Sequence, residues 1–536
     1  MTSPGDVADD GARGGALGGA RGGADATAVL AQGGRTSFAG FLLRLLARIP
    51  FLFVAGRLYG SAAVGRFGYA ILVVELTAQL ATIGLKRGMA DALARSTCEP
   101  TDPRRSAPHA DTVADAVLLG LLLAAAGAGL LLIWPALVFP TGPISSLDRL
   151  FPLVALAVAA SDISLAALAF RHDIAAQVRA RSVIEPWTLT LVAVPAFWLA
   201  GRAEGLLIAY AASMAAAAAA SLTPCLRSFG WPRHWRPSVA RLWRLARDNA
   251  PLAGADLADW GSRRLDFFIL GRFASAEVVG IYFVAQNIAS LPAKLKTSFD
   301  PILGPLLATA IAAGDRASVA AHVRQVAFWV LAAQFAVVLA LGITARASLG
   351  LFGPAFVAGA AVLAVLLTAE LLASQGAVAE AALIYLRRRS NLAIAAFGLA
   401  LQAGLTLAFV GRFGALAAAG GLAVAALAMS LIKSVFLARI VGARVSGWRP
   451  SLLVAAGGAF AVGLAVQRVP AWVLSAAGDL NLRIARARAL GEILQLSLGV
   501  VAILGTFALL IWTLGFTGPD RLLFTRRAAA RQPQVP

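Results

Sequence analysis

FVAGRLYGSAAVGRFGYA, at residues 53–70, aligns without gaps with FILGRFASAEVVGIYFVA, at residues 268–285. At the same offset of 215, eleven of the 35 positions between 48 and 82 are identical to their counterparts. Apolar residues match by composition alone, so the informative pairs are Gly56/Gly271, Arg57/Arg272 and Gly65/Gly280. We infer that the chain contains an internal repeat.

The composition is that of a membrane protein. Of 536 residues, 59% are hydrophobic and only 14% are charged, with a mean hydropathy of +0.78. A soluble chain is about a quarter charged. The apolar residues form repeated runs of about 20, as helical membrane spans require, and no alternating barrel strands are visible. The net charge of +20 lies mostly between these runs and is accompanied by no nucleic-acid motif, so nucleic acid is not an expected partner.

These runs predict an all-α polytopic membrane protein with about 14 transmembrane helices. The expected spans are 37–59, 66–85, 112–135, 150–170, 182–201, 205–225, 249–271, 276–297, 326–345, 355–377, 391–411, 415–438, 451–469 and 492–515. Arg and Lys concentrate in every second loop and in the C-terminal tail. By the positive-inside rule, both termini are expected in the cytoplasm.

The offset equates spans 1 and 2 with spans 7 and 8. Six spans separate the copies, so both halves have the same orientation, which is a parallel repeat. We expect two six-helix bundles, a cavity between them, alternating access by rocking, and two extra C-terminal helices. The predicted domains are a cytoplasmic tail at 1–36, bundles at 37–225 and 249–440, a basic cytoplasmic linker at 226–248, and a C-terminal part at 441–536.

The seventh span is unusually charged. On a helical wheel Asp256, Asp259, Arg263 and Asp266 form one stripe, at i, i+3, i+7 and i+10, and Arg264 flanks it. Span 1 carries Arg44 and Arg48 on one face, and Arg48 is the repeat counterpart of Arg263. A charged stripe at membrane depth is expected to face a bundle interior or water.

Two interpretations of these charges remain open. Arg44, Arg48, Arg263 and Arg264 form a cationic site for pyrophosphate or an acidic sugar, because guanidinium binds phosphate oxygens in pairs. Glu75, Asp256, Asp259 and Asp266 then position the arginines or bind a coupling ion. Alternatively, the charges neutralise one another, as Asp259 and Arg263 can at i, i+4. Asp162 on span 4 and Glu185 on span 5 have no neighbour in sequence that would define a role.

At residues 45–95, LLARIPFLFVAGRLYGSAAVGRFGYAILVVELTAQLATIGLKRGMADALAR resembles the opening helix pair of polysaccharide-biosynthesis flippases. These belong to the multidrug, oligosaccharidyl-lipid and polysaccharide exporter superfamily. RRLDFFILGRFASAEVVGIYFVAQNIASLPAKL, from residue 263, resembles the seventh and eighth helices of that family, and the resemblance extends over about residues 40–515. It implies a MATE-like fold and ATP-independent transfer of undecaprenyl-pyrophosphate-linked sugars to the periplasmic leaflet.

The sequence therefore predicts a flippase of the bacterial inner membrane, for lipopolysaccharide, other surface polysaccharide or exopolysaccharide. The alternatives are a cation-coupled multidrug exporter of the same superfamily, a lipid II flippase and, least favoured, a polytopic glycosyltransferase or polymerase. The expected partners are a lipid-linked anionic glycan, membrane lipids and a coupling cation, H⁺ or Na⁺. We expect a monomer without enzymatic activity, cofactor or metal site.

The basic linker continues into an amphipathic segment. Val239, Leu242, Trp243 and Leu245 alternate with Arg241, Arg244 and Arg247. This pattern predicts an interfacial helix on the cytoplasmic leaflet.

Overall fold

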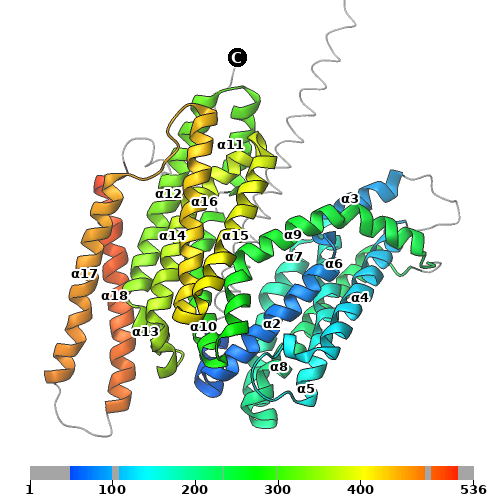
Figure 1. Ribbon diagram of the computed structural model, residues 1–536, viewed down its shortest axis with the longest axis horizontal. Coiled ribbons are helices and arrows are strands. Elements are labelled where there is room, and N and C mark those ends of the chain that lie inside the picture. The colour runs from blue at the N-terminus through cyan, green and yellow to red at the C-terminus, as the bar shows by residue number, and fades with distance from the viewer. Residues whose placement is uncertain (1–48, 99–107, 233–234, 298–299, 477–483, 517–536) are drawn as a thin grey trace, which may run out of the picture. The chain divides into compact units, whose positions relative to one another are not determined.

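The computed structural model describes residues 49–98, 108–232, 235–297, 300–476 and 484–516 (Figure 1). In these ranges the regular structure is helical throughout, so the predicted all-α fold is confirmed. The α-helices are α2 Ser61–Ala81, α3 Leu85–Cys98, α4 Pro108–Ile133, α5 Ser146–Leu150, α6 Val154–Phe170, α7 Ile174–Val178, α8 Glu185–Phe229, α9 Val239–Phe273, α10 Ala276–Thr297, α11 Asp300–Ala312, α12 Arg316–Ile343, α13 Ala345–Gly350, α14 Ala360–Leu386, α15 Arg388–Phe413, α16 Ala415–Val441, α17 Pro450–Ala476 and α18 Ile484–Leu514.

Within the described ranges, ten helical segments are long and apolar enough to cross a membrane. One of them, Ile174–Phe229, covers two predicted spans, joined at Gly201, where φ is +72°. The first predicted span lies partly outside the described residues, and Ile49–Tyr59 is its visible end. Helices α9 and α10 are not among the ten, and α9 carries the charged stripe. The chain is a multi-pass membrane protein.

One pair of helix boundaries reproduces the internal repeat. Helices α2 and α10 begin at Ser61 and Ala276, which are 215 residues apart, the offset found in the sequence. In each copy of the repeat, a glycine of positive φ also separates the fifth and sixth spans. It is Gly201 within α8 in the first copy and Gly414 between α15 and α16 in the second.

The two copies of the repeat meet where α2 crosses α10. A Cβ on Gly65 would lie 1.7 Å from the carbonyl oxygen of Ala276, and one on Gly280 would lie 1.9 Å from that of Ser61. Ser61 and Ala276 are themselves repeat counterparts, so the contact is reciprocal. Glycine at both positions allows the backbones to touch, as in other close helix crossings of membrane proteins.

Contacts divide the chain into two units. Unit 1 contains Val74–Pro135 and Ile144–Asp256, and unit 2 contains Ala55–Val73, Ala136–Pro143 and the chain from Leu257 onward. Helices α2 and α9 each run through both units, and the α2–α10 crossing belongs to unit 2. The domain boundaries expected from the repeat remain a prediction.

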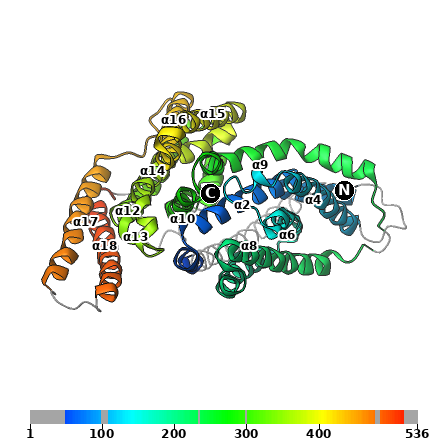
Figure 2. The same ribbon diagram turned by 60° about the horizontal axis from the view of Figure 1, so that its bottom comes forward.

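Each unit has an apolar core. In unit 1 Leu85, Met89 and Leu93 of α3 pack against α4 and α6, and in unit 2 a second core joins α11, α12, α14 and α16. The C-terminal helices α17 and α18 lie side by side in both views and also contact α12 (Figures 1 and 2). Large apolar side chains on the outer surface, such as Leu199, which is 87% exposed, are what lipid contact requires.

Gly65→Ala or Gly280→Ala is expected to destabilise the protein by roughly 3 kcal/mol, because the new methyl group meets backbone atoms that cannot turn aside. The unfolding temperature of the purified protein in detergent measures this. Gly129→Ala on α4 is the matched control, because nothing lies within 4 Å of its Cβ position. Equal unfolding temperatures for the three variants would contradict the close crossing.

Candidate functional site

The charged stripe lies on one continuous helix, α9. Asp259 and Arg263 form an ion pair of 3.1 Å along the helix, with side chains 51% and 64% exposed. Arg264 is half-buried. The sequence therefore placed Asp259 beside Arg263 correctly, and Arg263 keeps most of its guanidinium accessible.

Asp256 belongs to a different set of contacts. Its buried carboxylate pairs with Arg87 of α3 at 2.6 Å, so its ion-pair partner is on a neighbouring helix rather than on α9. The same two helices are joined by Arg95 and Asp248 at 3.1 Å. Gly84 and Gly88 allow this approach, because a Cβ at either would lie within 2.7 Å of Asn249. Asp256 therefore holds α3 against α9.

Asp266 is fully buried in unit 2. Its Oδ2 accepts a hydrogen bond from the Tyr282 hydroxyl and another, of 3.2 Å, from Gln286 Nε2. Both donors are on α10 and both are neutral, so these hydrogen bonds to Asp266 come from groups other than the arginines, and its role as charge partner or in ion coupling stays a prediction. Among the described residues, Asp266 Oδ1 and Gln286 Oε1 make no hydrogen bond of ordinary geometry. The site therefore offers two buried acceptor oxygens.

Of three further predicted residues, the structure describes only Glu75. Arg44 and Arg48 lie outside the described residues. Glu75 is half-buried on α2, on the side of unit 1 where it interacts electrostatically with Tyr210 of α8.

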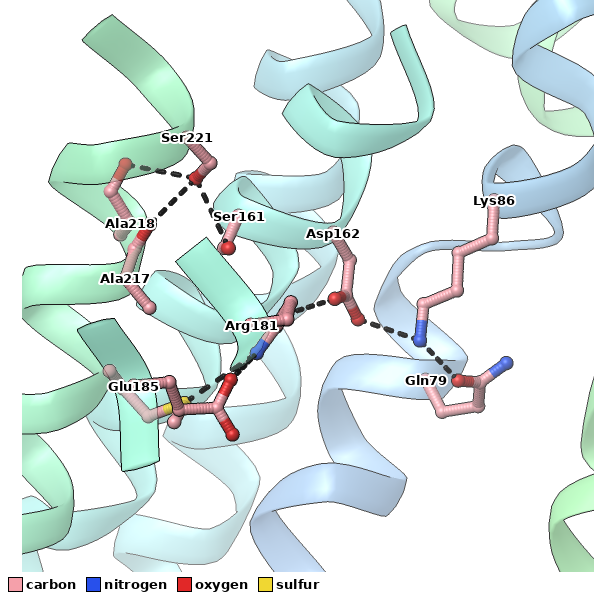
Figure 3. Close-up of polar contacts among 10 residues, drawn as sticks. Gln79, Lys86, Ser161, Asp162, Arg181, Glu185, Ala217, Ala218 and Ser221 are labelled. Atoms are coloured by element: carbon pink, nitrogen blue, oxygen red, sulfur yellow. Dashed lines mark hydrogen bonds and ion pairs between the residues drawn. The ribbon is translucent and has the colours of Figure 1, made fainter. Parts of the chain in front are cut away.

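A second group of charges lies in unit 1, and no sequence pattern indicates that its members meet (Figure 3). Asp162 of α6 lies between two cations, Lys86 of α3 at 2.6 Å and Arg181, which contacts its other oxygen. Arg181 also pairs with Glu185 at 2.9 Å, and Lys86 donates to Gln79 Oε1 at 2.6 Å. Asp162 and Glu185 are thus parts of one network rather than isolated acids.

Local backbone features bring these side chains together. The chain bends between α2 and α3 at Ile83 and Gly84, whose φ angles are +41° and +77°. This bend places Lys86 at the start of α3, one turn after the bend and within reach of Asp162. Arg181 lies on η4, a π-helical segment over Arg179–Ile184, where the wider turn changes the direction of its side chain. Such π-helical turns often occur at functional sites.

The network links four elements across the interior of a membrane unit. The side chains of Asp162 and Arg181 are 16% and 15% exposed, so water screens their attraction poorly. Two cations and two carboxylates balance in charge, which is the condition under which ionised groups are tolerated at membrane depth. These groups are suited to an ion-pair lock, and none forms an arrangement of nucleophile and base.

Unit 2 contains a comparable pair. Lys433 of α16, almost fully buried, contacts Glu380 of α14 at 2.8 Å, and Asn391 of α15 donates to the same carboxylate at 3.1 Å. In the repeat α14 corresponds to α6, the helix of Asp162. Each half therefore holds a carboxylate on its fourth helix with a cation from a later helix.

Among the described residues no group of three or more His, Cys, Asp or Glu side chains is arranged to hold a metal ion. Cys225 is buried with a free thiol.

No protein-family model matches the chain, and no curated protein matches it. Solved structures do. The lipid II flippase MurJ in an inward closed conformation aligns with a TM-score of 0.65 at 12% identity, over 89% of this chain and 99% of that chain. An inward-facing multidrug resistance MATE family transporter of the MOP superfamily aligns with 0.59 at 15%, over 75% and 98%. An outward-facing MATE structure gives 0.52 at 16%, over 77% and 95%.

At these identities the comparisons establish the fold. The chain has the architecture of the MOP superfamily transporters, so the predicted MATE-like fold is confirmed. The resemblance to polysaccharide flippases in particular remains a prediction, as do the substrate and the roles of the site residues.

Asp162→Asn is expected to destabilise the protein by about 3 kcal/mol, because it leaves Lys86 and Arg181 without their shared buried counter-charge. Unfolding in detergent measures the loss. Asp91→Asn is the control, since Asp91 pairs with Arg95 on the surface, with side chains 67% and 56% exposed, and such pairs contribute about 1 kcal/mol or less. Equal losses in the two variants would rule out a buried network.

Proposed function

We propose that this protein flips a polyprenyl-pyrophosphate-linked glycan across the bacterial inner membrane by alternating access, in the synthesis of a surface polysaccharide or exopolysaccharide. It acts as a transporter rather than an enzyme, and its termini lie in the cytoplasm. We further propose that it works as a monomer.

The extent of the structural match carries this proposal. The lipid II flippase aligns with 89% of this chain, whereas the two MATE transporters align with 75% and 77%. The additional helices α17 and α18 would account for a difference of this size. The longer match of this chain to a lipid II flippase supports a lipid-linked substrate here.

The charge on α9 supports an anionic substrate. Arg263 and Arg264 are adjacent on the membrane helix that also carries the accessible ion pair. An exporter of organic cations needs acidic or aromatic groups to hold them, and arginines repel such substrates. Pyrophosphate, in contrast, matches the planar fork of guanidinium groups.

Arg263 is available to a ligand on energetic grounds. Its pair with Asp259 is more than half exposed on both sides, and ion pairs of this kind contribute roughly 0–1 kcal/mol. A charge-assisted, bidentate bond to phosphate is stronger than that. We therefore assign Arg263 to the substrate site and Asp259 to the role of a partner that the phosphate displaces. Arg44, Arg48 and Arg264 complete the proposed cationic set.

The buried acids are proposed to serve the conformational cycle. Asp256 fixes α3 to α9, and Asp162 with Lys86 and Arg181 closes the interior of unit 1. We propose that the Asp266 carboxyl binds the coupling cation or proton. Its hydrogen-bond donors are neutral, and among the described residues its own Oδ1 and Gln286 Oε1 accept no hydrogen bond. Glu75 remains a proposed charge partner.

A lipid II flippase is the second candidate, because the lipid II flippase MurJ has the highest TM-score of the three structures described above. A multidrug exporter is the third, on the two MATE matches. Because these activities have different consequences in the cell, one deletion separates them.

Deletion of the gene is expected to abolish surface polysaccharide while the cells stay viable and keep their susceptibility to cationic drugs. Polysaccharide is measured by immunoblot or by staining of extracted glycan, and complementation with the wild-type chain restores it. Arrested cell-wall synthesis with accumulated lipid II would instead identify a lipid II flippase. Increased drug sensitivity with normal polysaccharide would identify an exporter.

Site variants in the same complementation assay separate a ligand role of Arg263 from pairing alone. Arg263→Ala is expected to lose most polysaccharide and Arg263→Lys to lose part of it, whereas Asp259→Ala retains it. The charge swap Asp259→Arg with Arg263→Asp stays inactive if Arg263 binds phosphate. Restoration of activity by the swap, at equal protein levels, would show that the pair itself is what matters.

Asp266→Asn is expected to remove the dependence of transport on the Na⁺ or H⁺ gradient, because the neutral amide cannot hold a cation. Uptake of labelled lipid-linked glycan into proteoliposomes with imposed gradients measures this dependence. Asp91→Asn is the control, since Asp91 is an exposed acid that pairs with Arg95 on the surface. Unchanged gradient dependence in Asp266→Asn would exclude the coupling role.

A further inference from the structure

The first part of α9 is basic and precedes the charged stripe. The helix has 35 residues, with Pro251 inside it, and Arg241, Arg244 and Arg247 lie before that proline. The positive-inside pattern predicts that this end of the helix lies at the cytoplasmic headgroups.

The structure revises the amphipathic pattern predicted for this segment. Leu242 and Leu245 pack against the core of unit 1, so they are not available to lipid. Arg241 is also used internally, because its guanidinium binds Asp115 of α4 at 2.8 Å, and Trp235 donates to the same carboxylate. One face of the segment therefore belongs to the fold.

The opposite face is exposed. Val239 and Trp243 are 84% and 69% exposed, and Arg244 and Arg247 are exposed beside them. On a helical wheel Val239, Ala240, Trp243, Arg244 and Arg247 occupy an arc of about 140°, which we name the Trp243 face.

We propose that the Trp243 face lies on the cytoplasmic leaflet and binds the phosphates of anionic phospholipids. An exposed Trp and Val need an apolar partner, and indole rings are favoured at the boundary between headgroups and acyl chains. The flanking arginines favour negative charge at the same depth, because juxtamembrane basic residues are attracted to anionic lipid. A soluble anion would satisfy the arginines but not the apolar side chains, so the bilayer is the partner that fits the whole face.

Lipid binding at the Trp243 face does not depend on which substrate is transported.

The test uses the purified full-length chain in neutral detergent. Added phosphatidylglycerol is expected to raise the unfolding temperature, and phosphatidylcholine is not. Arg244→Gln with Arg247→Gln is expected to weaken the apparent affinity for phosphatidylglycerol by about tenfold or more, since each basic residue contributes separately. Trp243→Ala is expected to weaken it as well, and 1 M NaCl removes the effect in the wild type.

Arg202→Gln with Arg346→Gln is the matched control, because it removes the same charge from exposed positions elsewhere. It is expected to respond to phosphatidylglycerol as the wild type does. If a variant already unfolds at a lower temperature without lipid, native mass spectrometry measures how much phosphatidylglycerol it retains. That amount is compared with the amount retained by the wild type. A wild-type response in the Arg244/Arg247 variant, or an equal stabilisation by inorganic pyrophosphate alone, would overturn the proposal.

Discussion

The contact between Gly65 and Gly280 is the constraint on which the arrangement of the repeat depends. Each glycine brings its helix so close to the other copy that a Cβ would lie within 2 Å of a carbonyl oxygen. In a membrane, helices gain no hydrophobic advantage from leaving lipid for one another, so close packing of small residues has to hold them together. A duplicated glycine meets this need from both sides at once, and therefore recurs in both copies.

The charges within the membrane units divide according to their partners. In unit 1 the cations Lys86 and Arg181 are balanced by the carboxylates of Asp162 and Glu185. Asp256 with Arg87 fixes one helix to another. Breaking such pairs exposes an uncompensated charge, so they favour a single conformation. The Asp259–Arg263 pair differs because it is accessible and costs little to open. Burial therefore distinguishes the charges that hold the fold from those that solvent reaches.

The features that depend on local pattern were predictable. Helical spans follow from apolar runs, the repeat follows from an offset of 215, and the pairing of Asp259 with Arg263 follows from their spacing. The partners of Asp162 and Asp266 were not predictable, because Arg181 and Tyr282 reach them only through helix packing and a π-helical turn. For Leu242 and Leu245, a helix pattern shows which side is apolar but not whether protein or lipid covers that side.

Helix α9 combines these separate requirements along its length. Its first turns present an exposed Trp and arginines, Asp256 secures it to α3, the Asp259–Arg263 pair follows one turn later, and Asp266 lies buried against α10. Along one helix that contains Pro251, a basic surface is thus followed by a buried ion pair, an accessible ion pair and an acid whose hydrogen-bond donors among the described residues are neutral. A helix serving only as a membrane anchor needs none of these groups and would be more stable with apolar residues in their place. The proposed role in moving a charged substrate would account for the charge retained along α9.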